Sequence, residues 1–259
     1  MVQLIINADD LGLTPGCNAG IVKAMTEGIV SDTTLMTNTA YTEDAVARLK
    51  SHGITQAGLH LNLTFGKPLC PITEVPSLVD EKGFFRRPVE QAVLSMNAQE
   101  AERELTSQVE KFLATGLNLT HLDGHHHVHG YPEILDIVIS LARQLQVPVR
   151  QTGETVRRML TEAGVVTTDS ISLHFYGPGA TMENLRTIIS NHHQGTLEIM
   201  CHPAEHDPLL YEISSYNVWR ERELAVLTSP EMIRFIKEQG IALTGFDKVT
   251  SGLRTARDQ

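Results

Sequence analysis

The chain reads Leu4-Ile5-Ile6-Asn7-Ala8 close to its N-terminus and continues directly with Asp9-Asp10-Leu11-Gly12. A short, uninterrupted apolar run of this kind is typical of a β-strand that is buried on both faces of a parallel sheet. Helical spacing of apolar residues follows over residues 18–28, where Gly28 is placed to end the helix. The stretch therefore predicts a strand, a polar turn and a helix, the repeating unit of α/β folds.

The same alternation recurs along the chain. Further strands are predicted at residues 33–37, 57–63, 119–123, 147–150, 170–173, 197–201 and 241–244, and helices at residues 43–50, 98–116, 132–146, 182–191, 218–227 and 230–239. Seven or eight such units with no change of composition between them predict a single α/β domain over residues 1–250, folded as a modified (βα) barrel of seven or eight strands. Residues 251–259 are expected to form a polar C-terminal tail.

Residues 64–88 interrupt this alternation, because prolines and glycines recur throughout them. Long loops inside compact domains are usually functional or disordered. We interpret this segment as a loop of the active site, and a plain surface excursion is the alternative.

Composition limits the classes of function that the chain can have. The 259 residues include 21 basic and 31 acidic side chains, which give a formal charge of 21 − 31 = −10. No run of Lys and Arg is present, whereas a nucleic-acid-binding protein would show a basic face. Hydrophobic residues make up 41% and charged residues 20% of the chain, which excludes a disordered protein. We therefore expect a globular protein that does not bind nucleic acid.

Membrane insertion and secretion are not expected either. The sequence has no apolar run of about 18 residues, the length that a membrane-spanning helix needs, and it lacks the basic start and long apolar run of a signal peptide. The cysteines, Cys17, Cys70 and Cys201, are odd in number and lie far apart. This spacing argues against a disulfide framework and a thiolate zinc site, and it favours the reducing cytoplasm.

Histidines cluster in the segment His121-Leu122-Asp123-Gly124-His125-His126-His127-Val128-His129. On an extended chain, alternate residues face one way, so His121, His125, His127, His129 and the carboxylate of Asp123 are expected on one side. Neutral imidazole is a common ligand of zinc and related ions, and a nearby carboxylate can orient a ligand histidine. A surface histidine tract is the alternative, but such tracts usually have low-complexity flanks, whereas this one lies between a predicted strand and an apolar helix.

Other polar residues follow predicted strands. Asp9 and Asp10 could divide the roles of metal ligand and base where their strand bends, or they could cap a turn or helix. His60 interrupts an apolar strand and is otherwise a hydrogen-bonded core histidine. His202 could be a general acid or a loop residue. Arg150 could tune a nearby aspartate or bind substrate, although a salt-bridged or solvated arginine is the common case.

Barrel enzymes place their chemistry at the carboxyl ends of the strands, so we expect these side chains to meet. Asp10, His60 and one histidine of the tract would form a two-histidine, one-carboxylate site with positions open for water and substrate. A metal in such a site lowers the pKa of its water and polarises a carbonyl group. Asp9 could then accept the proton of the water, and His202 could protonate a leaving amine. The set predicts metal-assisted hydrolysis of an amide or ester.

These motifs resemble the YdjC-like carbohydrate deacetylase family. The resemblance rests on residues 7–12, on Gly58-Leu59-His60, on the histidine tract and on Glu198-Ile199-Met200-Cys201-His202-Pro203, with further similarity at residues 28–31 and 66–69. It implies a modified (βα) barrel of the glycoside hydrolase/deacetylase type and one divalent metal ion, Mg²⁺ or Zn²⁺. The implied metal ligands are Asp10, His60 and His125, and the implied base is Asp9.

The sequence and the resemblance together predict a cytoplasmic deacetylase that acts on a short N-acetylated sugar such as diacetylchitobiose or its phosphate. His202 is expected to be the acid, and Asp123, His127 and Arg150 are expected to orient the metal ligands or contact the substrate. The alternatives are a metal-dependent phosphoesterase that acts on a sugar phosphate and a non-catalytic protein that binds sugar or metal. An acidic barrel is compatible with a homodimer, but no interface pattern is visible in the sequence.

Overall fold

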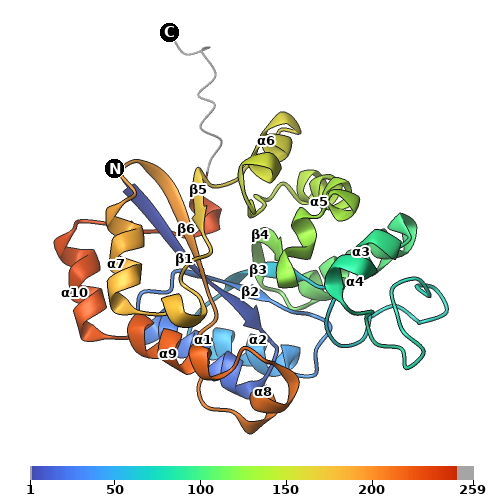
Figure 1. Cartoon of the computed structure of the whole chain (residues 1–259), viewed down its shortest axis with the longest axis horizontal. Coiled ribbons are helices and arrows are strands. Elements are labelled where there is room, and N and C mark those ends of the chain that lie inside the picture. The colour runs from blue at the N-terminus through green and yellow to red at the C-terminus, as the bar shows by residue number, and fades with distance from the viewer. Residues whose placement is uncertain (1, 250–259) are drawn as a thin grey trace.

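A parallel β-sheet lies at the centre of the computed structural model, which describes residues 2–249, and helices surround this sheet (Figure 1). The predicted polar tail, residues 251–259, lies outside the described residues. The strands are β1 (Val2–Leu11), β2 (Asp32–Leu35), β3 (Gln56–Leu61), β4 (Asn118–Gly124), β5 (Ser170–Ser172), β6 (Gly195–Cys201) and β7 (Ala242–Leu243).

The α-helices are α1 (Pro15–Glu27), α2 (Thr42–Ser51), α3 (Val89–Ser95), α4 (Ala98–Ala114), α5 (Pro132–Leu145), α6 (Glu154–Glu162), α7 (Met182–Ser190), α8 (Pro208–Ile213), α9 (Val218–Leu227) and α10 (Pro230–Glu238). Three 3₁₀ turns, η1 (His125–Gly130), η2 (Gly177–Gly179) and η3 (Phe246–Lys248), complete the described elements. In Figure 1, α7 and α10 lie on one side of the sheet and α3 to α6 lie on the other.

The seven strands of the sheet are ordered β4-β3-β2-β1-β6-β5, and the short β7 pairs with the start of β1. Every one of these pairings is parallel. The fold is a modified (βα) barrel, which confirms the predicted fold class and strand number. Because all strands run in the same direction, their carboxyl ends, and the polar residues that follow them, lie at one end of the sheet.

Strand β1 is the centre of this arrangement. Leu4, Ile6, Ala8 and Leu11 are completely buried, as the apolar run predicted, and β1 pairs with both β2 and β6. Helix α1 follows after a short turn, in which the hydroxyl of Thr14 accepts a hydrogen bond from the first helical turn. The buried strand therefore delivers its two aspartates to the carboxyl end of the sheet at a well-defined position.

Some predicted elements differ from the structure. Residues 147–150 do not form a full strand, because Val149 makes only one isolated bridge, to Leu122 of β4. Helices α3, α6 and α8 were not predicted. These helices have 7, 9 and 6 residues, which is too few for a helical spacing of apolar residues to be recognised in the sequence.

The loop of residues 64–88 is anchored by a buried carboxylate of α4. The backbone N–H groups of Leu69 and Cys70 donate to Glu104 at 3.0 and 2.9 Å. Near the two ends of this loop, Phe65 and Arg87 line the cavity that also contains Asp9 and Asp10, so the loop borders the site described below.

The described residues bear on two expectations from the sequence, the absence of a membrane-spanning helix and the absence of disulfides. Within residues 2–249, no helix combines the length and apolar character that a membrane crossing requires. The three cysteines are buried and free, in agreement with the absence of a disulfide framework.

We predict that Gly20→Ala destabilises the protein by about 1–3 kcal/mol, the usual cost of overpacking. A Cβ atom on Gly20 would lie 2.4 Å from the Cα atom of Ala204 and 2.7 Å from the backbone nitrogen of Glu205, so α1 would have to move away from the segment after β6. Urea unfolding measures the difference. Glu27→Ala, at an exposed position in the last turn of α1, is the control and should leave the unfolding midpoint unchanged. A more stable Gly20→Ala protein, as helix propensity alone would give, would contradict this account of the packing.

Candidate metal and catalytic site

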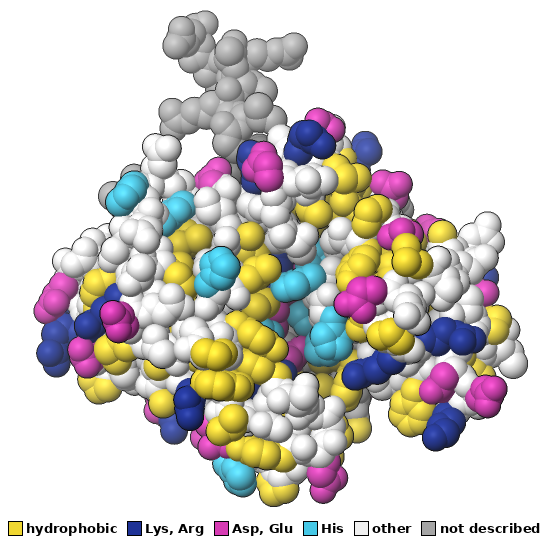
Figure 2. All heavy atoms as spheres, viewed as in Figure 1, with side chains coloured by type: hydrophobic (Ala, Val, Ile, Leu, Met, Phe, Trp, Pro, Cys, Tyr) yellow, Lys and Arg dark blue, Asp and Glu magenta, His cyan; other side chains and the backbone are white. Residues whose placement is uncertain are grey.

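A cavity of about 380 Å³ opens at the carboxyl end of the sheet. Figure 2 shows histidine side chains gathered around a central hollow, with acidic groups deeper inside and hydrophobic groups along one rim. The predicted site residues that line it are Asp9, Asp10, His60, His125, His127 and His202. The parallel sheet thus brings together residues that are as much as 193 positions apart in the sequence (202 − 9 = 193).

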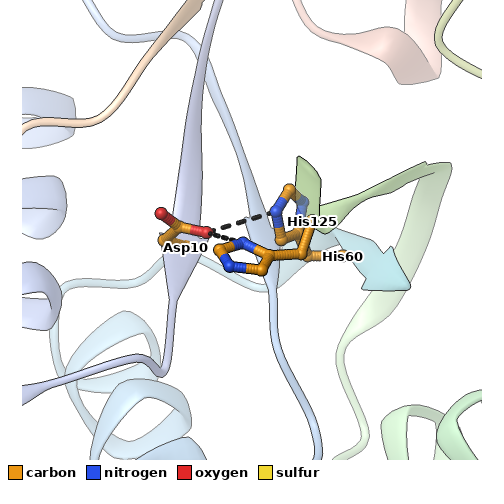
Figure 3. A group of neighbouring side chains, drawn as sticks. All are labelled: Asp10, His60 and His125. Carbon is orange, nitrogen blue, oxygen red and sulfur yellow. Dashed lines mark hydrogen bonds and ion pairs between the residues drawn. The ribbon is translucent and has the colours of Figure 1, made fainter. Parts of the chain in front are cut away.

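Asp10, His60 and His125 point toward one another at the bottom of this cavity (Figure 3). Oδ1 of Asp10 lies 3.2 Å from Nε2 of His60 and 2.8 Å from Nδ1 of His125. One potential ligand atom from each residue lies within 4.8 Å of those of the other two, and all three residues are buried. Two imidazole nitrogens and one carboxylate oxygen in this arrangement have the composition of a divalent metal site.

Asp123 of β4 orients one of these histidines. Its Oδ1 lies 2.8 Å from Nδ1 of His60, and its Oδ2 accepts a hydrogen bond from the hydroxyl of Thr34 at 3.1 Å. In the neutral ring, a proton on Nδ1 of His60 leaves Nε2, which faces Asp10, free to bind a cation. Burial lowers the pKa of His60, but Asp123 and Asp10 outweigh it and raise that pKa to about 10. Surroundings that favour a positive charge on His60 also suit a bound cation, so the residues fit a metal.

Arg150 is the buried cation beside this group. Its guanidinium donates to both oxygens of Asp9 at 2.6 and 2.7 Å, to Glu198 at 2.6 Å, and lies 2.8 Å from Asp123. Burial acts to raise the pKa of Asp9, but Arg150 outweighs burial and lowers it, so Asp9 is ionised. Burial raises the pKa of Glu198 to about 8 although Arg150 acts to lower it, so one arginine faces three buried acidic groups.

A second group of potential ligand atoms, from Asp9, His60 and Asp123, also meets the spacing of a metal site. Arg150 already contacts both carboxylates of this group. Its guanidinium supplies the positive charge there, so this group has no need of a second metal ion.

The backbone explains how two adjacent aspartates serve one cavity. Asp10 has a positive φ of 68°, which is uncommon for a residue other than glycine and turns the chain sharply at the end of β1. The side chain of Asp9 faces Arg150, whereas that of Asp10 faces the two histidines and Arg220. Burial acts to raise the pKa of Asp10, but His125 and Arg220 outweigh it and hold that pKa well below its usual range.

The histidine tract is extended only as far as Gly124, where β4 ends, so the prediction of one shared face along the whole tract was wrong. The next residues form η1, in which His126 and His127 both have left-handed backbone angles near φ 53° and 54°. His125 and His127 line the cavity, whereas His121, inside β4, stacks on Phe246 with ring centroids 3.7 Å apart.

Within the tract, only His125 belongs to the potential metal group among the described residues. His126 lies 2.9 Å from the hydroxyl of Thr64, and His127 lines the cavity with an Nδ1 atom that has no hydrogen-bond partner among the described residues. Burial and the nearby Arg150 lower the pKa of His127 to about 4, so it is neutral near pH 7.

His202 follows β6 and lines the same cavity as Asp10, His60 and His125. Its backbone N–H donates to the buried carboxylate of Glu223, and its Nδ1 atom lies 4.0 Å from the same side chain. Burial and Arg220 lower the pKa of His202 to about 3, so the free protein holds it neutral.

Sequence reasoning missed three residues of the site, Tyr216, Arg220 and Glu223. Arg220 of α9 donates to Oδ2 of Asp10 at 2.6 Å, and the hydroxyl of Tyr216 donates to Glu223. Arg220 and Glu223 lie three residues apart on one face of α9, and Tyr216 lies in the loop just before this helix. This spacing is the only local signal in the sequence that could have indicated them.

Known proteins are similar to this chain over most of its length. The family model described as YdjC-like protein matches residues 3–238. A carbohydrate deacetylase of Brevibacillus brevis is 41% identical over 96% of this chain and 100% of its own length, and one of Geobacillus stearothermophilus is 40% identical over 92% and 94%. A solved structure from Enterococcus faecalis V583, described as that of a candidate cellobiose-phosphate cleavage protein, superposes with a TM-score of 0.89 at 34% identity and covers 95% of this chain and 97% of that one.

We predict that Arg150→Gln lowers the free energy of unfolding by about 3–5 kcal/mol at neutral pH, because it leaves buried carboxylates unpaired. Without the guanidinium, burial raises the pKa values of Asp9 and Asp123 above their unfolded value of about 4. Stability is then lost as the pH rises through the raised pKa values, so the deficit should be smaller at pH 5 than at pH 8.

Urea unfolding of both proteins at the two pH values checks this prediction. Arg157→Gln is the matched control, because Arg157 pairs only with the exposed Glu154 on its own helix. A deficit that is equal at both pH values would show that the carboxylates do not respond to the loss of Arg150.

Proposed function

Since the chain belongs to the YdjC-like family, we propose that it is a metal-dependent carbohydrate deacetylase. The proposed reaction is hydrolysis of the acetamide of a short N-acetylated sugar, such as diacetylchitobiose or its phosphate, which is the activity of a chitooligosaccharide deacetylase. Deacetylation of a sugar is supported by the carbohydrate deacetylases that resemble the chain over nearly its whole length. The observation that carries it is the convergence of Asp10, His60 and His125 beside an ionised Asp9.

Asp10, His60 and His125 would hold one divalent cation. When bound, that cation would activate a water molecule and polarise the acetamide carbonyl. Neutral imidazole and carboxylate ligands suit zinc, cobalt or nickel better than magnesium, although both Mg²⁺ and Zn²⁺ are candidates. Arg220 holds Oδ2 of Asp10 at 2.6 Å, so the carboxylate presents Oδ1 to the two histidines in a fixed orientation.

Asp9 is the proposed general base. Arg150 binds both of its oxygens and keeps it ionised, and Asn7 donates a further hydrogen bond at 2.8 Å. A carboxylate fixed by three hydrogen bonds keeps one orientation, as a base must if it is to accept a proton from a water molecule in the cavity. The hydroxide that remains attacks the carbonyl carbon of the acetamide.

His202 is the proposed general acid. Cleavage of the carbon–nitrogen bond requires a proton on the departing amine, and His202 lines the cavity just after the end of β6. It is neutral in the free protein, so it can donate only after it has received a proton. The proton that Asp9 takes from the water is the one that His202 passes to the amine. The reaction then yields acetate and a free amino sugar.

Metal-dependent phosphoester hydrolysis is less well supported. Such enzymes often use two metals held by several carboxylates. Here the second group of carboxylates is bound to Arg150. A non-catalytic binding protein would give the ionised Asp9, held at the cavity wall, no role.

The direct test is acetate release from diacetylchitobiose. We expect release that stops with a chelator and returns with added metal, and no phosphate release from sugar phosphates. Asp9→Asn should lower kcat by a factor of about 10² to 10⁴, the usual contribution of a general base. Asp136→Asn, on the exposed side of α5, is the control and should behave like the wild type. Near-normal turnover of Asp9→Asn would refute the base assignment.

Metal content tests the assignment of His125 within the tract. We expect His125→Asn to weaken metal binding more than about 100-fold. A residue that only orients a ligand typically contributes about 10- to 100-fold to the affinity, so a direct ligand should contribute more. His126→Asn is the matched control, because His126 lies next in sequence and lines the same cavity but is absent from the group that could hold a metal. Calorimetric titration of metal into each protein measures both affinities. Equal losses in the two variants would contradict the assignment.

A further inference from the structure

We propose that Tyr176, supported by Tyr216, forms the surface on which the pyranose ring of the reacting sugar stacks. This inference rests on the proposed deacetylase function and adds a binding subsite to it. Tyr176 lies in the loop after β5 and Tyr216 in the loop before α9, and both line the cavity that contains the metal group.

The two tyrosine rings form a rigid pair. Their centroids are 4.0 Å apart and their planes differ by 8°. The hydroxyl of Tyr216 donates to the buried Glu223 and accepts the backbone N–H of Gly177 at 2.9 Å, so the inner ring is fixed at its polar end. Gly177 directly follows Tyr176, and the same hydrogen bond therefore holds the loop that carries the outer ring. A surface that is already ordered loses little conformational entropy when a ligand binds.

The outer ring is accessible from the cavity. Tyr176 is 46% exposed, whereas Tyr216 is only partly exposed behind it. Aromatic side chains commonly line pockets that bind small ligands and contact those ligands. Figure 2 shows the hydrophobic side chains that border the central hollow beside the histidines.

The position of His202 links this surface to the proposed chemistry. The ring of His202 lies 5.6 Å from that of Tyr176 and 5.5 Å from that of Tyr216, edge-on to both. In a 2-acetamido sugar the amide nitrogen is bonded directly to a ring carbon. Any such nitrogen that accepts a proton from His202 must therefore bring the pyranose ring against the side chains that flank His202. Of these two tyrosines, Tyr176 is the more exposed.

The chemistry of the surface suits a neutral sugar ring. One face of a pyranose presents C–H groups, and the face of an aromatic ring carries the negative part of its quadrupole, which attracts the positive edge of C–H bonds. The negative face of the aromatic ring would disfavour an anionic group at the same place. The subsite therefore recognises the ring itself, and the polar groups of the metal site recognise the acetamide.

The test is equilibrium binding of diacetylchitobiose to metal-loaded Asp9→Asn protein, measured by calorimetry, with and without a second change at Tyr176. We expect Tyr176→Ala to weaken binding about tenfold, whereas Tyr176→Phe, which keeps the ring, should bind within about twofold of its parent. In the otherwise wild-type enzyme, Tyr176→Ala should raise KM with little change in kcat. Thermal unfolding of each variant verifies that it is folded.

Tyr211→Ala is the matched control, because Tyr211 is 41% exposed, donates to Glu221 at 2.8 Å and does not line the cavity. It should bind the disaccharide as its parent does. Unchanged affinity in Tyr176→Ala, an equal loss in Tyr176→Phe, or no binding of the disaccharide at all would overturn the proposal. Acetate release by the wild-type chain is scored separately: its absence would refute the deacetylase function, and the binding comparison would still decide the role of Tyr176.

Discussion

The buried guanidinium of Arg150 is the interaction on which the rest of the site depends. It is completely buried and contacts carboxylates from three strands, Asp9 of β1, Asp123 of β4 and Glu198 of β6. Three acidic groups in a protein interior would repel one another and favour protonation, which raises the cost of closing the sheet around them. One planar cation with several donors offsets that cost and also determines the direction in which each carboxylate points. The position of His60, which contacts Asp123 from the other side, follows from the same network.

This network explains how neighbouring aspartates acquire different chemistry. Asp9 is bound through both oxygens by Arg150, whereas Asp10 turns away through its positive φ and divides its oxygens between Arg220 and two histidines. Both carboxylates are ionised, but only Asp10 offers an oxygen to the cluster of imidazole nitrogens. The strained backbone at Asp10 is tolerated because ion pairs on both sides fix the conformation, as is common where strain is retained at a functional site.

The sequence was sufficient to predict features that depend on local patterns. Buried strands such as β1 are recognisable by their apolar runs, and the barrel rule places the residues at their carboxyl ends, including Asp10 and His60, at one end of the sheet. The course of the histidine tract could not be predicted, because alternation indicates a face only while the chain stays extended, and His126 and His127 leave that conformation. Arg220 was missed for a different reason: its partner Asp10 lies 210 residues away, and one arginine on a polar helix carries no local signal.

The site divides into a floor and a rim, and the two parts have different structural origins. The floor consists of charged groups on or directly after strands, where Arg150 and the sheet register restrict every side chain. The rim is formed by loops, with Tyr176 after β5 and Tyr216 before α9, and it is attached to the floor through the hydrogen bonds of Glu223 to Tyr216 and His202. A change in the floor alters the charge balance of the whole network, whereas a change of an exposed rim side chain leaves that balance intact. For the proposed deacetylase, selection among sugars would therefore be adjusted in the rim while the chemistry of the floor is preserved.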